Sequence, residues 1–451
     1  MGQEIEPPAP GPAEASPPAG PVTAADGPGP ASAAGADPEA DGEPERPPAV
    51  PLLEPRDGLP PLVASAGALR EAVRALGAGE GPVAVDAERA SGFRYGHRAF
   101  LVQLRRRGAG TVLIDPVACP DLSDLDAALS GTEAVLHAAS QDLPCLADLG
   151  YRPRALFDTE LAGRLLGYPR VGLGPLVENV LGLALEKGYA AADWSTRPLP
   201  EDWLRYAALD VEVLVELRDA LAEELVAQGK DEWARQEFTA VLNAGPPAPR
   251  AEPWRRTSGI HRVRTRRGLA IVRELWLERD RIAQRRDLSP GRVLPDSAIV
   301  EAARAAPATP AALAGTPGFK GRGAKRHAQE WFAAIRRAYT EADQALPRPS
   351  AQVSEGPPPA HRWHERDPEA ARRLAAVRAV IAALSDEHSV PAENLLQPDS
   401  VRRLAWQPPD SVTTEAVAAD LSGYGARPWQ VQLTSAPIAG ALLRLAEKGD
   451  D

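Results

Sequence analysis

The stretch Val83-Ala-Val-Asp-Ala-Glu88 decides the fold of this chain and gives the first indication of its chemistry. An apolar run leads into an acid, and a second acid follows two positions later, as at the end of a buried strand. Because side chains alternate along a strand, Asp86 and Glu88 point to the same face. Two such carboxylates repel each other unless a cation lies between them, and hard cations such as Mg²⁺ prefer carboxylate oxygen. The pair indicates a metal site, with a solvated surface pair of acids as the alternative.

The elements around this stretch follow in an order that predicts an α/β fold. A helix is predicted to begin near Ser65, and beyond residue 140 the pattern is helical, with Asp158 capping one helix. The segment PLPEDWLRYAALDVEVLVELRDALAEEL, from Pro198, predicts one long helix. Strands first and helices afterwards predict a sheet packed by helices. Besides residues 83–87, runs rich in β-branched and apolar residues predict strands at 99–105, 111–115 and 134–138.

Three more polar residues extend the pattern of acids. Asp142, in HAASQDL, follows the fourth predicted strand, and it could also be a helix N-terminal acid stabilised by the helix dipole. Tyr206 and Asp210 are four residues apart on a predicted helix and therefore share one face. A partly buried tyrosine beside a surface acid would give the same spacing. Each residue taken singly leaves both interpretations open.

The order of these residues resembles the exonuclease superfamily that is named for its four acids, in its tyrosine branch. The segments LFDTELAGRLLG, GLGPLVENVLG and LEKGYAAADWSTRPLPEDWLRYAALDVEVLVEL resemble the ribonuclease D family over about residues 60–228. The spelling DWSTRPL ahead of Tyr206 is the most specific part of this match. The resemblance implies a ribonuclease H-like α/β exonuclease domain. It also implies a metal-dependent 3′→5′ exoribonuclease that trims tRNA precursors or other small structured RNAs.

The resemblance also implies a role for each acid. Two divalent ions, Mg²⁺ or Mn²⁺, about 3.5–4 Å apart can serve both ends of an in-line displacement at phosphorus. Asp86 would bridge both ions, Glu88 and Asp210 would complete the first site, and Asp142 would hold the second. Tyr206 would orient the attacking water, because a phenol with a pKa near 10 is a poor base at neutral pH.

Other polar residues of this region carry weaker predictions. Lys187 and Arg197 could contact phosphate, since both precede Tyr206 in the family-like stretch. Arg197 could equally pair with an acid such as Asp193. His137 is interpreted as a structural histidine rather than a catalytic one.

The net charge of −11 is distributed unevenly along the chain. Residues 1–55 and 56–245 each carry −9, and residues 346–451 carry −3. Residues 246–345 carry 20 bases and 10 acids, a net charge of +10. A strongly basic segment in an acidic protein indicates a polyanionic partner for that segment.

That basic segment resembles the HRDC domain over about residues 262–342, on WLERDRIAQRRDLSPGRVLPDSAIVEAA. Such modules pack helices and often bind nucleic acid; a basic bundle that docks another protein is the alternative. Loop amides at a helix start suit a phosphate, and the segment KGRGAKR precedes a predicted helix. The residues predicted to contact nucleic acid are Arg262, Arg264, Arg266, Arg267, Lys320, Arg322, Lys325 and Arg326.

Proline-rich breaks divide the chain into predicted parts. Residues 1–55 are rich in Pro, Ala, Gly and acids and are predicted to be a disordered tail. The parts that follow are an exonuclease domain at 56–245, an all-α HRDC domain at 254–345, a linker at 346–364 and a second, divergent HRDC-like helical domain at 365–446.

The remaining features of the sequence bound the class of protein. It contains no apolar run long enough for a membrane span and no signal peptide, which favours the cytoplasm. The two cysteines are expected to be free thiols. Two alternatives to the exoribonuclease stay open: a DNA 3′→5′ exonuclease with the same acids, and a non-catalytic nucleic-acid-binding protein that keeps the fold. No residue declares a contact to the 2′-hydroxyl that would separate RNA from DNA.

Overall fold

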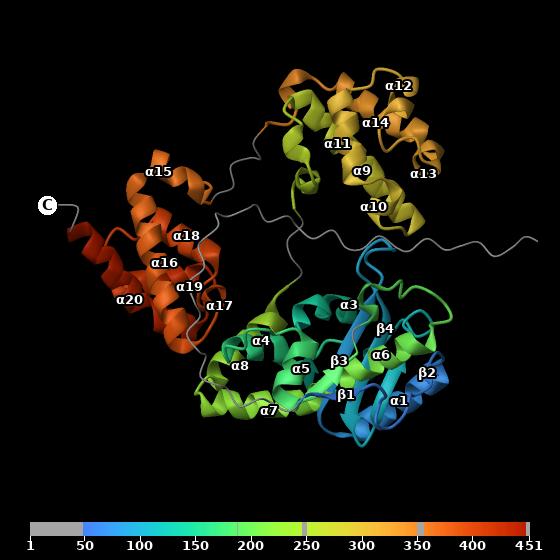
Figure 1. Ribbon diagram of the computed structural model, residues 1–451, viewed down its shortest axis with the longest axis vertical. Helices are drawn as coiled ribbons and strands as arrows, with labels where there is room; N and C mark the ends of the chain where they lie inside the picture. The colour runs from blue at the N-terminus through green and yellow to red at the C-terminus, as the bar shows by residue number, and fades with distance from the viewer. Residues whose placement is uncertain (1–47, 187, 246–249, 350–355, 448–451) are drawn as a thin grey trace, which may run out of the picture. The chain divides into compact units, whose positions relative to one another are not determined.

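The computed structural model describes residues 48–186, 188–245, 250–349 and 356–447. Most of the predicted tail therefore lies outside the described residues. The first region of the described chain holds a mixed sheet with helices against it, and two all-helical regions follow (Figure 1). This order confirms the predicted fold class, an α/β domain followed by helical modules.

The main sheet has six strands, and residues 83–88 lie on one of its central strands. Strand β3 (Glu80–Arg89) pairs antiparallel with β4 (Ala99–Arg107) and parallel with β6 (Glu133–Leu136). The four strands predicted from apolar runs are confirmed. The edge strands β2 (Leu62–Val63) and β7 (Ala155–Asp158) were not predicted, because runs this short give no clear alternation. The strand order across the sheet is β2-β5-β4-β3-β6-β7, with β5 at Gly110–Ile114.

Helices of this region begin at the caps that the sequence predicts. The Ser65 hydroxyl accepts a hydrogen bond from the Ala68 amide at the start of α1 (Ala66–Ala78). Asp158 caps α4 (Thr159–Leu165) by accepting from the amides of Glu160 and Leu161. The core between sheet and helices is built from Leu, Val, Ile and Ala, as expected from the few aromatic residues. The other helices are α2 (Ser123–Ala128), α3 (Leu143–Asp148), α5 (Leu173–Leu181) and α8 (Asp231–Asn243).

The prediction of one long helix from Pro198 is wrong. The segment forms two helices, α6 (Glu201–Glu212) and α7 (Leu214–Ala227), which are separated at Val213. Neither Pro nor Gly stands at the break, so local propensity gives no warning of it. Helix α6 packs on β3, β4 and β5, whereas α7 packs on α4 and α5 as well as on β3 and β6. The break lets the two halves pack against different sets of elements.

The predicted tail is also too long at its C-terminal end. Residues 50–52 form strand β1 (Val50–Leu52), which pairs in parallel with β8 (Leu183–Leu185) in a separate two-stranded sheet. Composition alone hides this strand, because the apolar VPLL follows directly on the proline-rich stretch. Pro51 is tolerated because the strand is a sheet edge.

The second region is a helical module built around α9 (Arg266–Arg286). Trp331, from α14 (Ala328–Thr340), is fully buried in its core. Helix α9 ends in Asp287, which has a left-handed backbone (φ 48°). The other helices of this module are α10 (Pro290–Val293), α11 (Asp296–Ala305), α12 (Pro310–Gly315) and α13 (Arg322–Arg326).

The third region repeats a feature of the second. Its long helix α16 (Pro368–His388) is 21 residues long, the same length as α9, and it also ends at a residue with a left-handed backbone, Ser389 (φ 52°). In both modules a four-residue helix follows, α10 or α17 (Ala392–Leu395). This parallel supports a divergent second HRDC-like module, which stays a prediction. The other helices are α15 (Trp363–Arg366), α18 (Pro398–Trp406), α19 (Thr414–Gly423) and α20 (Pro428–Glu447).

Over the described residues, no helix combines the length and apolar character that crossing a bilayer demands. Cys119 and Cys145 are both free and buried, as expected.

Candidate active site

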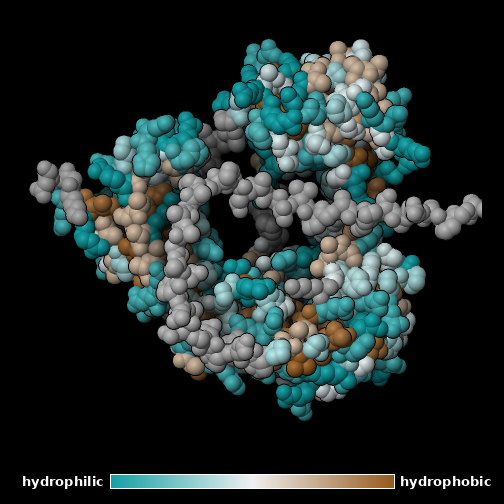
Figure 2. Space-filling view, in the orientation of Figure 1, coloured by the Kyte–Doolittle hydropathy of each residue, from teal (hydrophilic) through white to brown (hydrophobic). Residues whose placement is uncertain are grey.

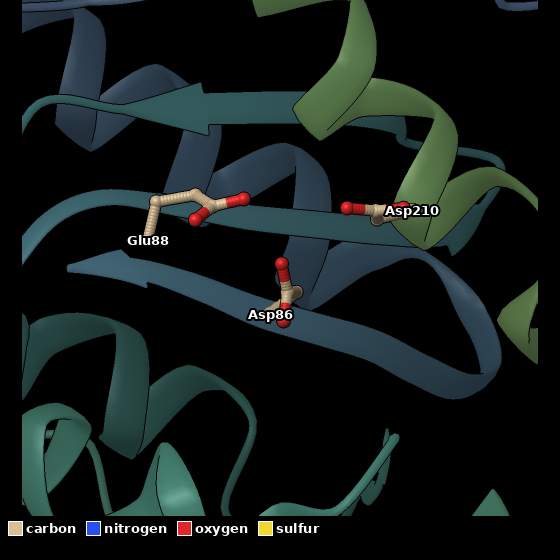
Figure 3. Close-up of side chains that lie close together, drawn as sticks. All are labelled: Asp86, Glu88 and Asp210. Atoms are coloured by element: carbon tan, nitrogen blue, oxygen red, sulfur yellow. The ribbon is translucent and has the colours of Figure 1, made fainter. Parts of the chain in front are cut away.

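Three of the predicted acids converge at the end of β3. Each of Asp86, Glu88 and Asp210 offers a carboxylate oxygen within 4.8 Å of the others. Figure 3 shows Asp86 and Glu88 reaching from the strand and Asp210 from helix α6 toward a common space. The alternation of a strand and the placement of α6 across it produce this meeting of residues far apart in sequence.

Asp142 lies in the same cleft but outside that group of three. The cleft has a volume of about 610 Å³ and is lined by all four acids and by Tyr206. Asp142 is only 5% exposed, and among the described residues its Oδ1 has no hydrogen-bond partner. The nearest cation is Arg89, whose Nη2 lies 3.3 Å away. A buried carboxylate oxygen without a hydrogen bond indicates that a ligand completes this side of the cleft.

Gln103 on β4 orients the first acid. It stands directly opposite Asp86 in the strand register, and its Nε2 donates to Asp86 Oδ2 over 3.2 Å. Its side chain is fully buried. The bond fixes one carboxylate oxygen of Asp86.

A buried carboxylate holds the turn that carries Asp142. Asp158, at the end of β7, accepts hydrogen bonds from the amides of Ala138 and Ala139 as well as from the two amides of α4. Ala138 has a left-handed backbone (φ 58°, ψ 50°), which costs energy for a residue with a Cβ. The Asp142 amide in turn donates to the Ala139 carbonyl. Asp158 therefore stabilises the strained turn that presents Asp142.

The crowding of these acids disfavours their ionised forms. Burial is the largest cause of the raised pKa of Asp86, Glu88, Asp142 and Asp210, and neighbouring carboxylates add to it in the last three. Arg89 opposes the rise at Asp86, Glu88 and Asp142. Groups this close cannot all ionise without further positive charge in the cleft.

Tyr206 lies beside Asp210, as the four-residue spacing predicts. Burial, followed by the charges of Asp210, Glu88 and Asp86, raises the pKa of its phenol. The phenol also hydrogen-bonds to Asp210 and thereby lowers the pKa of that acid. A phenol held in its neutral form can donate or accept a hydrogen bond, but it cannot remove a proton from water.

His137 has the surroundings of a structural residue. Its Nδ1 lies 2.9 Å from the Thr159 hydroxyl, and burial lowers its pKa to about 4. The ring is therefore neutral at physiological pH, although it lines the cleft.

Arg197 is bound within the protein. Its Nε and Nη2 donate to the two carboxylate oxygens of Asp115, over 2.9 and 2.7 Å, and Nη1 donates to the carbonyls of Trp194 and Thr196. Asp193, the partner considered from sequence, accepts from Ser195 instead. The predicted phosphate contact of Arg197 thus gains no support from the geometry. Lys187 lies outside the described residues.

The predicted basic residues of the second region divide into two groups. Arg266 donates to the Leu346 carbonyl, and Arg267 donates to the carbonyls of Ala338 and Glu341. Arg262 is paired with Glu301. These three therefore contribute to the module's own structure. Arg264, Lys320, Arg322, Lys325 and Arg326 are exposed, as is the paired Arg262.

Helix α9 adds two arginines that the sequence analysis missed. Arg285 and Arg286 are exposed at its C-terminal end, and Arg286 Nη1 lies 3.5 Å from Nε2 of His327, which directly follows α13. We call Arg285, Arg286, Arg322, Lys325 and Arg326 the α9–α13 basic face. Figure 2 shows hydrophilic residues over α13. The paired arginines in IAQRRD were the available indication.

The other missed residues of the cleft each had a weak indication in the sequence. Gln103 is the one polar residue in the run AFLVQL. Arg89 directly follows Glu88, and Asp158 was predicted only as a helix cap. None of these patterns is specific enough to assign a role without the three-dimensional contacts.

The donor set of the cleft fits divalent metal ions. Oxygen is the only donor type among the four acids, as hard cations require. The clustered oxygens of Asp86, Glu88 and Asp210 provide ligands on one side of the space. On the other side is an Asp142 oxygen that accepts no hydrogen bond from the described residues. The raised pKa values reflect the same shortage of positive charge.

Three parts of the chain match models of known protein families. Residues 62–226 match the model of a 3′-5′ exonuclease, and residues 268–335 match the HRDC domain. Residues 356–442 match the model of a 3′ to 5′ exonuclease C-terminal domain. The HRDC resemblance seen in the sequence is thereby confirmed.

Similar proteins extend over most of the chain. A crystal structure of a protein from Bifidobacterium adolescentis is 38% identical, with a TM-score of 0.80, and covers 88% of this chain and 100% of that one. The structure of Escherichia coli RNase D, an exoribonuclease involved in structured RNA processing, is 26% identical, with a TM-score of 0.62 over 86% of this chain and 98% of its own. Ribonuclease D of Gluconacetobacter diazotrophicus is 31% identical over 334 residues, 72% of this chain and 81% of that protein. By this identity and coverage, the chain belongs to the ribonuclease D family.

Proposed function

We propose that this 3′→5′ exoribonuclease uses Asp86, Glu88, Asp142 and Asp210 to hold two divalent cations, Mg²⁺ or Mn²⁺, and hydrolyses the terminal phosphodiester of RNA between them. The observation that carries the proposal is the convergence of three carboxylates within 4.8 Å of one another, with Asp142 in the same cleft. Bound cations would lower the pKa of water to give a nucleophile and would stabilise the charge that develops on the leaving oxygen.

Other residues of the protein orient the acids and the attacking water. Gln103 holds Asp86 in one orientation, and Asp158 holds the turn that presents Asp142. The neutral Tyr206 phenol is placed to orient the attacking water, because its raised pKa excludes it as a base. Asp86 is the candidate to serve both cations, since its charge acts on Glu88 and Asp210 on one side and on Asp142 on the other.

We propose RNA 3′ ends as the substrate, from tRNA precursors or other small structured RNAs. The E. coli relative, an exoribonuclease involved in structured RNA processing, supports this class. The HRDC module supports it as well, because a face of exposed basic side chains suits a phosphate backbone. The proposed location is the cytoplasm, where such RNAs are found.

The α9–α13 basic face, with Arg264 and Lys320 of the same module, is the proposed contact with RNA. These side chains are exposed, whereas Arg266 and Arg267 are bonded to carbonyls of the module itself. The exonuclease region carries a net charge of −9, so a basic module supplies attraction that the catalytic region lacks.

The experiment that tests this function is the digestion of a 5′-labelled RNA and its DNA equivalent with Mg²⁺ or Mn²⁺. We expect a ladder of RNA products shortened from the 3′ end. The variant D86N should abolish this ladder and leave RNA binding nearly intact. Preferential digestion of DNA would favour the DNA exonuclease instead. An absence of digestion of both polymers with either metal would favour a non-catalytic binding protein.

A further inference from the structure

Arg89 enters the cleft although strand alternation places it on the opposite face from Glu88. The register of β3 with β4 shifts at this point: Glu88 stands opposite Leu101, but Arg89 stands opposite Ala99. Such irregularities increase the local twist and redirect side chains, often beside active sites. Arg89 accordingly lines the same cleft as the four acids.

The contacts of Arg89 anchor it beside Asp142 without binding that acid tightly. Its Nη1 donates to the Gln141 carbonyl over 2.6 Å. Its Nη2 lies 3.3 Å from Asp142 Oδ1, within ion-pair distance but without hydrogen-bond geometry. The side chain is 24% exposed, so one edge of the guanidinium faces solvent. Nη2 also donates to Gln141 Oε1 over 3.5 Å. The two bonds to Gln141 hold the guanidinium in the cleft, while its contact with the acid is loose.

Arg89 brings positive charge into the cleft. Arg89 is the single Lys or Arg among the described residues that line it. A phosphate that approaches the four acids is attracted by this guanidinium and by bound cations. Guanidinium matches phosphate geometry with paired N–H donors.

We infer that Arg89 is an exchangeable cation, which lies against the Asp142 carboxyl group in the metal-free cleft and contacts an RNA phosphate when a divalent cation binds Asp142. This inference rests on the proposed function. A divalent cation displaces the loose contact readily, because it brings twice the charge to the same oxygen. The bond to the Gln141 carbonyl keeps the released guanidinium in the cleft.

Two measurements with R89M should move in opposite directions. In the absence of RNA, Mn²⁺ can be titrated and monitored by electron paramagnetic resonance. The site that includes Asp142 should bind Mn²⁺ several-fold more tightly in R89M, because the competing guanidinium is gone. In the Mn²⁺-dependent digestion of RNA, KM should rise about tenfold with kcat changed much less, the loss expected for one charge-assisted hydrogen bond. The variant R89K keeps the charge, so its KM should lie between that of R89M and that of the wild type.

A purely structural role gives a different result. If Arg89 only holds the turn at Gln141, R89M should weaken Mn²⁺ binding, lower Tm and lower kcat together. That pattern overturns the inference, and so does an R89M protein whose Mn²⁺ affinity and KM both equal those of the wild type. R70M is the matched control, since Arg70 is an exposed arginine of α1 in the same region and outside the cleft. It should match the wild type in every measurement.

The wild-type protein separates this inference from the proposed function. Failure of the wild type to digest RNA with either metal contradicts the function itself. Normal wild-type digestion together with an unaltered R89M contradicts only the exchange of Arg89 between Asp142 and phosphate.

Discussion

Gln103 and Asp86 face each other across β4 and β3, with the amide nitrogen of Gln103 3.2 Å from Oδ2 of Asp86. The other amide atom, Oε1, is buried and has no hydrogen-bond partner among the described residues. A polar side chain kept in a fully apolar run at this cost indicates a role in orienting the acid.

Replacing Gln103 by leucine should therefore harm activity more than folding. We expect Q103L to lower kcat/KM about tenfold, since the variant removes one hydrogen bond to a charged group. Its Tm should stay within a few degrees of the wild type, because the variant also removes the unpartnered Oε1. Thermal unfolding and steady-state digestion of labelled RNA measure the two effects. A large fall in Tm with unchanged kcat/KM would show that Gln103 supports the sheet rather than Asp86.

Divalent ions should stabilise the folded protein. A ligand at 100 times its Kd adds about 2.7 kcal/mol to the free energy of unfolding. We expect Mn²⁺ to raise Tm and a chelator to lower it. In chelator, D86N should be more stable than the wild type, because one of the mutually repelling carboxylates is gone. An identical Tm with Mn²⁺ and with chelator would contradict a metal site in this cleft.

The pH dependence follows from the direction of the pKa shifts. Burial and neighbouring acids raise the pKa of Asp142 to about 8 and that of Glu88 to about 10. Because these values lie above the unfolded values of about 4, their stabilisation of the metal-free fold is fully present below pH 4. It is lost as the pH rises through about 8 for Asp142 and about 10 for Glu88. Tm in chelator should fall over this range.

Metal binding should reverse this loss of stability, because metal ligands must be deprotonated. Calorimetric titration of Mn²⁺ at pH 7 in buffers of different ionisation enthalpy should reveal the release of roughly one to two protons. The same titration of D142N should release fewer protons. Binding without proton release would mean that the acids are already ionised in the metal-free protein.

The two groups of basic residues in the HRDC module should respond differently to substitution. When a substitution removes one contact to a phosphate of single-stranded RNA, the slope of the logarithm of the binding constant against the logarithm of salt concentration becomes smaller by about 0.7. K325Q/R326Q should weaken RNA binding and reduce that slope by about 1.4, with Tm unchanged. R267Q should lower Tm, because Arg267 donates to two carbonyls at the end of α14, and leave the salt slope unchanged. Fluorescence anisotropy over a range of salt concentrations distinguishes these outcomes.

Asp158 should matter for both stability and catalysis. It is 1% exposed and accepts four backbone hydrogen bonds, two of them from the turn ahead of Asp142. D158A leaves these amides unpartnered and should lower the free energy of unfolding by about 3 kcal/mol. D158N keeps the shape and should fold, but with lower Mn²⁺ affinity than the wild type. If D158N bound Mn²⁺ with the same affinity as the wild type, the role of Asp158 would be limited to capping α4.

The sequence was sufficient to predict features that depend on local periodicity. Strand alternation brought Asp86 and Glu88 to one face, and helical spacing brought Tyr206 beside Asp210. The ordering of strands and helices predicted the fold class for the same reason.

Features that depend on tertiary packing were not predictable in this way. The break at Val213 arises because α6 and α7 pack against different elements. The entry of Arg89 into the cleft depends on a register shift between two strands. The internal partners of Arg266 and Arg267 are carbonyls far away along the chain, at separations of 80 and 71 positions. No local pattern contains such information.

The bidentate pair of Arg197 with Asp115 bears on how catalytically active members of this family are distinguished from inactive ones. Arg197 belongs to the stretch DWSTRPL, which carries the most specific part of the family resemblance. Its pair with Asp115 connects this loop to the residue that follows β5, and we call this pair the loop tether. A descendant could lose every carboxylate of the cleft and keep this tether intact, because the tether serves the scaffold. Relatives should therefore be sorted as active or inert by the residues at positions 86, 88, 142 and 210, however well the more recognisable loop is preserved.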